Sequence, residues 1–221
     1  MFKGAEIRRL LIFSLVVIVM AINMKAFAQK SPNVRLGVLK YGTVNWEVDV
    51  IKHHKLDKKY GFTLDVLSLG SKNASAVALQ SDAVDIILTD WLWVNRQRAN
   101  DKDITLFPTS IATGGLYVAN DSPAKDVRDL ANKRVGIAAG INFWHYGARL
   151  KAKGHRILVT VPEILHALHI ENDVPLLGWA FKKPWAEQHA NSIKGFLQAS
   201  LAAKQILYSS DEEWTRIRGL T

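Results

Sequence analysis

Short apolar segments alternate with helix-like segments from Asn33 onward, and this alternation constrains the fold more than any other feature. The clearest unit runs from Ala78 to Val94, where a short helix leads through a turn to an apolar strand that ends in Thr-Asp-Trp. Such alternation predicts parallel βαβ units and therefore an α/β fold. In open α/β sheets, ligands bind outside the carboxyl ends of the strands. The sequence therefore predicts a binding site at that end of the sheet.

Several apolar segments have the length and composition of strands. Helices are expected at about 44–59 and 142–153, each followed by a glycine that can take the left-handed conformation of a helix end. After Pro184, apolar residues at helical spacing predict a long helix that packs on the first part of the chain. Ser210 precedes Glu213 by three residues, which predicts a cap at the start of a last short helix. The expected strands are 34–39, 63–69, 84–89, 116–119, 134–138, 156–161 and 176–181.

The first residues have the pattern of an export signal. Basic residues precede the apolar run Leu10–Ile22, and Ala26-Phe27-Ala28 precedes Gln29. The run is shorter than the roughly 20 residues that span a bilayer, so a cleaved signal at 1–28 is favoured and the mature chain is expected to be periplasmic. A retained anchor is the alternative, because polar residues just before the cleavage point are unusual.

The chain after the signal is expected to divide into two lobes. Two glycines follow Thr113 where the early alternation ends, so we place a lobe boundary there. The length and the 48% hydrophobic content suffice for packed cores. We expect lobe 1 at 29–112, a reduced lobe 2 with crossing strands at 113–185, and C-terminal helices that pack on lobe 1 at 186–221.

Composition excludes several kinds of site. The 221-residue chain has no cysteine, which excludes a disulfide framework, a thiol nucleophile, a thiolate metal site and lipid attachment through cysteine. Its formal net charge is +9, but the basic residues are scattered among acidic ones and form no run with aromatic residues. This distribution argues against nucleic-acid binding.

Motifs of enzymes are absent from the sequence as well. There is no Gly-x-Ser-x-Gly elbow, phosphate loop or His-Glu-x-x-His pattern. Glu163, His166 and His169 spread around a helix at their spacing, so a solvated face is favoured over a metal site. We therefore expect no enzyme activity, no cofactor and no metal.

Several short motifs occur in a characteristic order and spacing: Asn45-Trp46-Glu47, Ala78-Leu79-Gln80 with Val84-Asp85-Ile86, Thr89-Asp90-Trp91-Leu92-Trp93-Val94, Asp129-Leu130 with Lys133-Arg134-Val135-Gly136-Ile137-Ala138, and Pro175-Leu176-Leu177-Gly178. Together they resemble the nitrate/sulfonate/taurine-type periplasmic substrate-binding proteins of ABC importers. The resemblance implies a periplasmic-binding-protein-like α/β fold of two lobes with mostly parallel sheets. It also implies a small ligand, anionic or sulfonate-, nitrate- or pyrimidine-like, in the cleft between lobes, a membrane permease as partner, and a monomer.

Carried over residue by residue, the resemblance implies ligand contacts in the loops that follow the first three strands. A glycine there lets the backbone approach a ligand, a helix start favours an anion, and an indole ring stacks on an apolar body. Thr113 is added at the lobe boundary, where a hinge is the favoured interpretation. The implied contacts are Tyr41, Gly42, Asn45 and Trp46, then Ser71, Lys72, Asn73 and Ala74, then Asp90 and Trp91.

Structural roles compete with binding at most of these positions. Asn45 and Asp90 are favoured as helix N-caps. The Asp90 carboxylate would repel a sulfonate, so it either caps the helix that follows or selects a cationic or hydroxyl-bearing ligand. Trp91 and Trp93 cannot share a helix face, so one of them is expected in the core. Trp46 is equally well interpreted as core, and the Ser71 to Asn73 segment as plain turn chemistry.

The sequence also departs from the family pattern. After the expected strand at 134–138, only Ala139-Gly140-Ile141-Asn142 precedes the segment Phe143-Trp144-His145-Tyr146. In the family a similar segment comes later, so at least one βαβ unit of about 30 residues is expected to be absent here. The chain also ends earlier than family members do. We therefore expect reduced ligand affinity, and two alternatives stay open. One is a non-transporting remnant or an exported interaction or sensor protein, and a weaker one is an enzyme similar to those of thiamine-pyrimidine synthesis, whose cysteine cluster is absent here.

Overall fold

The computed structural model describes residues 31–111, 114–136, 144–171 and 174–219. The expected signal at 1–28 and Thr113 lie outside the described residues. In chain order the elements are β1 (Asn33–Leu39), α2 (Val44–His53), α3 (Leu56–Lys59), β2 (Thr63–Leu69), α4 (Lys72–Gln80), β3 (Ile86–Asp90), α5 (Trp91–Arg98), β4 (Ile104–Ser110), β5 (Gly115–Ala119), η1 (Val127–Leu130), α6 (Trp144–Ala152), β6 (His155–Thr160), α7 (Val161–Ala167), β7 (Leu177–Lys182), α8 (Lys183–Gln188), α9 (Ala190–Ser209) and α10 (Asp211–Ile217).

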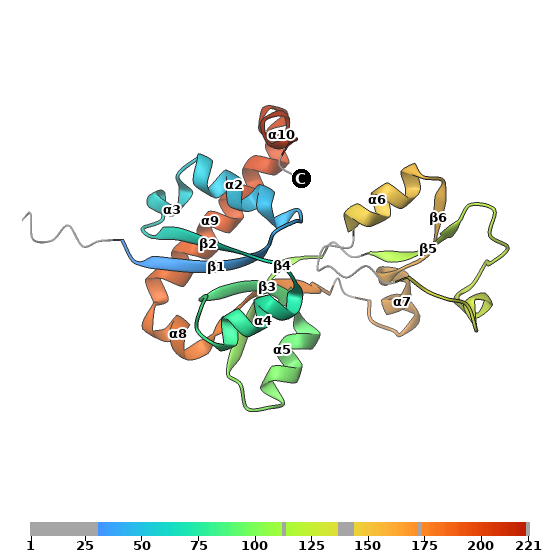
Figure 1. The fold of residues 1–221 in the computed structure, drawn as a ribbon, viewed down its shortest axis with the longest axis horizontal. Coiled ribbons are helices and arrows are strands. Elements are labelled where there is room, and N and C mark those ends of the chain that lie inside the picture. The colour runs from blue at the N-terminus through green and yellow to red at the C-terminus, as the bar shows by residue number, and fades with distance from the viewer. Residues whose placement is uncertain (1–30, 112–113, 137–143, 172–173, 220–221) are drawn as a thin grey trace, which may run out of the picture. The chain divides into compact units, whose positions relative to one another are not determined.

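A five-stranded mixed sheet in the order β2-β1-β3-β7-β4 forms the centre of the larger part of the fold (Figure 1). Strand β1 pairs in parallel with β2 and β3, whereas β7 pairs antiparallel with both β3 and β4. Strands β1 to β4 therefore run in one direction and β7 in the other. The α/β prediction is confirmed, and the insertion of β7 makes the sheet mixed.

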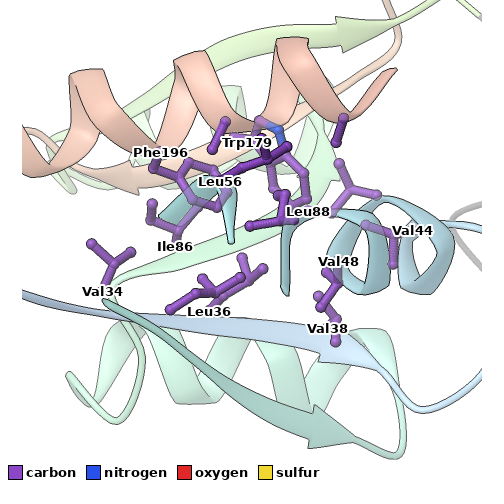
Figure 2. Packing of buried hydrophobic residues seen from close by; sticks show 14 of the residues in the cluster. Val34, Leu36, Val38, Val44, Val48, Leu56, Ile86, Leu88, Trp179 and Phe196 are labelled. Carbon is purple, nitrogen blue, oxygen red and sulfur yellow. The ribbon is translucent and has the colours of Figure 1, made fainter. Parts of the chain in front are cut away.

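The core on one face of this sheet lies beneath α2, α3 and α9. Leu36 of β1 and Ile86 of β3 point into it and are fully buried. Figure 2 shows Trp179 of β7 and Phe196 of α9 between that helix and the sheet, with ring centroids 5.1 Å apart at 79°. Edge-to-face aromatic pairs of this kind add to the stabilisation from burial, so α9 is fixed on the sheet as the sequence predicts.

The opposite face of the sheet is covered by α4 and α5. Leu79 of α4 and Val94 of α5 pack on Ile87, Ile104 and Ala180 of the sheet. Ile87 follows Ile86 in β3 but faces the other core, because successive side chains of a strand point to opposite faces. Burial on both faces explains the continuous apolar run that identifies β3 in the sequence.

A second, two-stranded antiparallel sheet pairs β5 with β6. Together with η1, α6 and α7 it makes up what we name the small-sheet region, the described residues of 114–171. The Arg156 side chain donates hydrogen bonds to the backbone oxygens of Ser122 (3.0 Å) and Ala124. Among the residues of this region whose burial the structure describes, only Ala124 and Gly147 are buried. Its core is therefore thin.

Local patterns misplaced a few elements. Strand β4 is not among the predicted strands. Pro108 interrupts its sequence, and the pairing of β4 with β7 is irregular just after this proline. Strand β4 lies at the sheet edge, where proline is tolerated. The predicted helix at 44–59 breaks at Lys55, whose φ of 52° separates α2 from α3. The predicted strand at 134–138 is wrong for 134–136, which pair with no described strand, and residues 137–138 lie outside the described residues.

Candidate ligand-binding edge of the sheet

The loops that follow β1, β2 and β3 meet at one edge of the five-stranded sheet, which we name the candidate edge. Leu39 and Leu69, the last residues of β1 and β2, are paired in register. The Lys40 backbone N–H donates to the Leu69 carbonyl oxygen at 3.0 Å. Because β3 runs parallel to β1, its last residue, Asp90, ends at the same side. The predicted gathering of these loops is thus present in the fold.

An ion pair joins two of the loops. The Lys72 ammonium contacts Oδ2 of Asp90, and the two side chains are 37% and 20% exposed. The other oxygen, Oδ1, accepts the Trp93 backbone N–H at 2.8 Å, which confirms the N-cap interpretation of Asp90. Partial burial raises the pKa of the Asp90 carboxyl, but hydrogen bonds from Lys72 and Trp93 with the Lys72 charge outweigh it, so the pKa is lowered overall.

Ser71 is the N-cap of α4. Its Oγ accepts the Ala74 backbone N–H at 3.1 Å, and its carbonyl oxygen accepts the Ser75 hydroxyl at 3.2 Å. The turn-chemistry interpretation is therefore confirmed for Ser71. Asn73 is exposed in the first turn of the same helix, and Ala74 is half-buried. A ligand role for this turn stays a prediction.

The loop after β1 is held together by Asn45. Its Nδ2 lies 3.2 Å from the Leu39 carbonyl oxygen and 3.1 Å from that of Gly42. The N-cap interpretation of Asn45 is wrong, because α2 already begins at Val44 and Thr43 occupies the cap position. Asn45 instead fixes the loop from within the helix. Gly42 has a φ of 139°, a conformation that side chains disfavour, and Tyr41 is 76% exposed.

The tryptophans of the predicted site have separate surroundings. The half-buried Trp46 packs edge-to-face on Trp214 of α10, with ring centroids 5.1 Å apart. Trp93 is 8% exposed and belongs to the core beneath α4 and α5, so the expectation that one of Trp91 and Trp93 is core is confirmed. The Trp91 indole N–H is shielded from solvent and donates to no described residue, while its backbone N–H reaches the Leu176 carbonyl oxygen at 3.3 Å.

A buried polar network near this edge was missed by the sequence interpretation. Glu47 of α2 accepts the Ser200 hydroxyl at 2.5 Å, and Ser200 in turn accepts the Trp179 indole N–H at 3.0 Å. Lys204 lies 3.8 Å from the other Glu47 oxygen and donates to the Thr109 carbonyl oxygen at 2.9 Å. Burial raises the pKa of Glu47 and outweighs the charge of Lys204 and the two hydrogen bonds that lower it. The signal in the sequence is a carboxylate within the apolar stripe of a helix.

The proposed helix face at Glu163 has a structural role. Glu163 completes a capping box at the start of α7, where its Oε2 accepts the Thr160 backbone N–H at 2.6 Å. His169 follows that helix at a φ of 60°. Within the described residues, no group of three or more histidine, aspartate or glutamate side chains could hold a metal ion. In the same part of the chain, no helix combines the length and apolarity that crossing a membrane requires.

Solved structures are similar to this chain in fold. No protein-family model and no curated protein sequence matches it. The periplasmic aliphatic sulphonate binding protein SsuA from Escherichia coli superposes with a TM-score of 0.57 at 18% identity, over 80% of this chain and 74% of that one. The alkanesulfonate-binding protein SsuA from Xanthomonas axonopodis, bound to MOPS, gives a TM-score of 0.62 at 12% identity, over 88% of this chain and 82% of that one.

A third similar structure is a Candida albicans protein, the CA3427 gene product, described as having the generic periplasmic binding protein fold. It gives a TM-score of 0.53 at 12% identity, over 84% of this chain and 75% of that one. At such identities the likeness concerns the fold alone. The chain is thus an α/β protein with the periplasmic binding protein fold.

Proposed function

We propose that this chain is an exported solute-binding component of an ABC importer rather than an enzyme. The observation that supports this most is the meeting of three loops at the candidate edge, where open α/β sheets bind ligands. The similar structures include sulfonate-binding proteins. The proposed ligand is a small solute with an acidic group, of the sulfonate, nitrate or pyrimidine-like kind.

The proposed ligand contacts are those of the candidate edge, with Lys72 as the counter-charge of the acidic group. The side chain of the exposed Asn73 and the Trp91 indole N–H make no hydrogen bond within the described residues, so both are proposed to contact the ligand. The proposed division into lobes at 29–112 and 113–185, with 186–221 packed on the first, places this edge on lobe 1. A monomer in the periplasm that delivers its ligand to a permease completes the proposal.

A second candidate is a remnant or an exported interaction or sensor protein that does not capture solute. The thin core of the small-sheet region favours it, since high affinity requires a ligand to be enclosed and water to be excluded. A shortened second lobe would supply less of that enclosure. Under this proposal the fold is retained while ligand affinity is lost or reduced.

Calorimetric titration with sulfonates, nitrate, taurine and pyrimidine-like compounds separates the two candidates. The importer proposal expects micromolar binding of at least one compound, weakened at least ten-fold by Lys72→Met. The matched control is Lys182→Met, which removes an ion pair with Asp82 (2.8 Å) at the opposite end of the strands. This substitution should leave binding unchanged. No binding to any compound would favour the second candidate, and co-purification with a permease tests the transport context.

A further inference from the structure

Opposite charges are balanced where β2 and β3 end. Lys72 and Asp90 contact each other across the two loops, and both side chains are partly exposed, so a ligand can reach them. The remaining titratable side chains in the three loops are those of Lys40 and Tyr41. The Lys40 ammonium lies 5.4 Å from the centroid of the Tyr41 ring, and both residues are exposed. Lys40 is therefore a solvated charge, and the Lys72 and Asp90 pair is the shielded one.

A ligand with a single charge fits this pair poorly. A simple anion that contacts Lys72 comes close to the Asp90 carboxylate, and like charges in a half-buried site repel. A simple cation that contacts Asp90 meets the Lys72 ammonium in the same way. Asp90 cannot turn away to relieve the repulsion, because its Oδ1 caps α5 through the Trp93 backbone N–H.

We infer that the ligand is a small zwitterion, with an ammonium group beside its acidic group. The ammonium takes the place of Lys72 at Oδ2 of Asp90, and the acidic group binds the released Lys72 ammonium. The flexible four-carbon stem of lysine allows this movement, while the cap holds Asp90 in place. Both charges of the protein then keep an opposite partner. The inference rests on the proposed function and names its ligand class.

Matched pairs of compounds test the inference by calorimetry. Taurine is compared with ethanesulfonate, and β-alanine with propionate, since each pair differs by the ammonium group; ethylamine supplies the cation alone. We expect at least one zwitterion to bind at least ten-fold more tightly than its partner without the ammonium group and than ethylamine.

Asp90→Asn shows whether Asp90 supplies the preference. Asparagine is as good an N-cap as aspartate, so the start of α5 is retained while the charge is lost. We expect the ratio of zwitterion to simple-anion affinity to fall to about one. The control is Asp82→Asn, which removes the carboxylate that pairs with Lys182 at the opposite end of the strands. Asp82 has a φ of 59°, which asparagine tolerates. This control should keep the ratio of the unmodified protein, and thermal unfolding checks that both variants fold.

The outcomes separate the inference from the proposed function. Binding of ethanesulfonate, propionate or nitrate as tight as that of the zwitterions overturns the inference and leaves the binding-protein proposal standing. The same holds if Asp90→Asn keeps the ten-fold ratio. Absence of binding to every compound, including those of the preceding titration, contradicts the proposed function and the inference together.

Discussion

Glu47 places a carboxyl group in the core between α2 and α9, where desolvation favours its protonated form. Lys204 and Ser200 contact it directly, and Trp179 reaches it through Ser200. A folded-state pKa above the unfolded value means that the folded protein binds this proton more tightly. Stability from this group is therefore fully present at acid pH and is lost as pH rises through the folded pKa.

Glu47→Gln should remove this pH dependence. The glutamine oxygen can still accept the Ser200 hydroxyl, and Lys204 keeps its bond to the Thr109 carbonyl oxygen. We expect the free energy of unfolding of the variant, relative to the unmodified protein, to increase from about pH 4.5 upward. Urea denaturation at several pH values measures it. Glu212→Gln, at an exposed position, should show no such trend, and a flat difference for Glu47→Gln would contradict the assignment.

Single residues show where sequence interpretation succeeds and where it stops. The N-cap role of Asp90 is predicted from its neighbours alone, because a cap depends on the next three residues. Asn45 has the same chemistry but bonds backward to Leu39 and Gly42. The role of Glu47 depends on Ser200, more than 150 residues away, and no local pattern contains such a contact.

The last helix, α10, is fixed by both charge and apolar contact. Glu213 is buried and accepts hydrogen bonds from Arg216, which also contacts Asp49 of α2. The hydrogen bonds from Arg216, with a smaller contribution from His54, lower the pKa of Glu213 against the opposing effect of burial. Ile217 at the end of the helix is fully buried. The predicted cap at Ser210 is confirmed, with its Oγ 3.1 Å from the Glu213 backbone nitrogen.

Ile217→Ala should loosen α10. Truncation of a fully buried isoleucine costs about 2–5 kcal/mol, and the loss falls on the helix that ends the described chain. We expect chemical denaturation to show a reduced free energy of unfolding and limited proteolysis to cut first near α10. Val77→Ala provides the control, because Val77 is 61% exposed and its truncation should change stability by no more than about 0.5 kcal/mol. Equal effects of the two substitutions would contradict the packing of α10.

Elements with their own periodicity were predicted from the sequence, and elements defined by partners were not. Strand β2 has the predicted bounds and β1 begins one residue earlier than predicted, since both lie between clear turn signals. Strand β4 depends on β7, which arrives from more than 60 residues further along the chain. Its Pro108 hides the strand pattern, so only the pairing reveals it.

Long-range pairing decides the arrangement of the whole molecule. The chain leaves the large sheet after β4, forms the small-sheet region, and returns as β7 between β3 and β4. The α/β class follows from alternation along the sequence. The antiparallel insertion of β7 does not, because strand order is set by contacts between distant segments. The candidate edge, like the α/β class, could be predicted from the alternation along the sequence, because parallel strands joined by helices end on the same side of the sheet.

Burial divides the described chain into a well-packed part and a poorly packed part, which predicts unequal stability. In the large sheet, β1 and β3 are enclosed by helices on both faces. In the small-sheet region, by contrast, the described side chains of both strands are only half-buried or exposed. Segments with few buried apolar contacts open at lower free energy than the global unfolding transition.

Hydrogen exchange measured by mass spectrometry should resolve this difference. We expect backbone amides of β5 and β6 to exchange at least about ten-fold faster than those of β1 and β3, which corresponds to an opening free energy lower by roughly 1.4 kcal/mol. Strand β7 is the internal control: it follows the small-sheet region in the chain but pairs within the large sheet, so its amides should exchange as slowly as those of β3. Equal protection of β5, β6 and β3 would contradict the link between thin packing and low local stability.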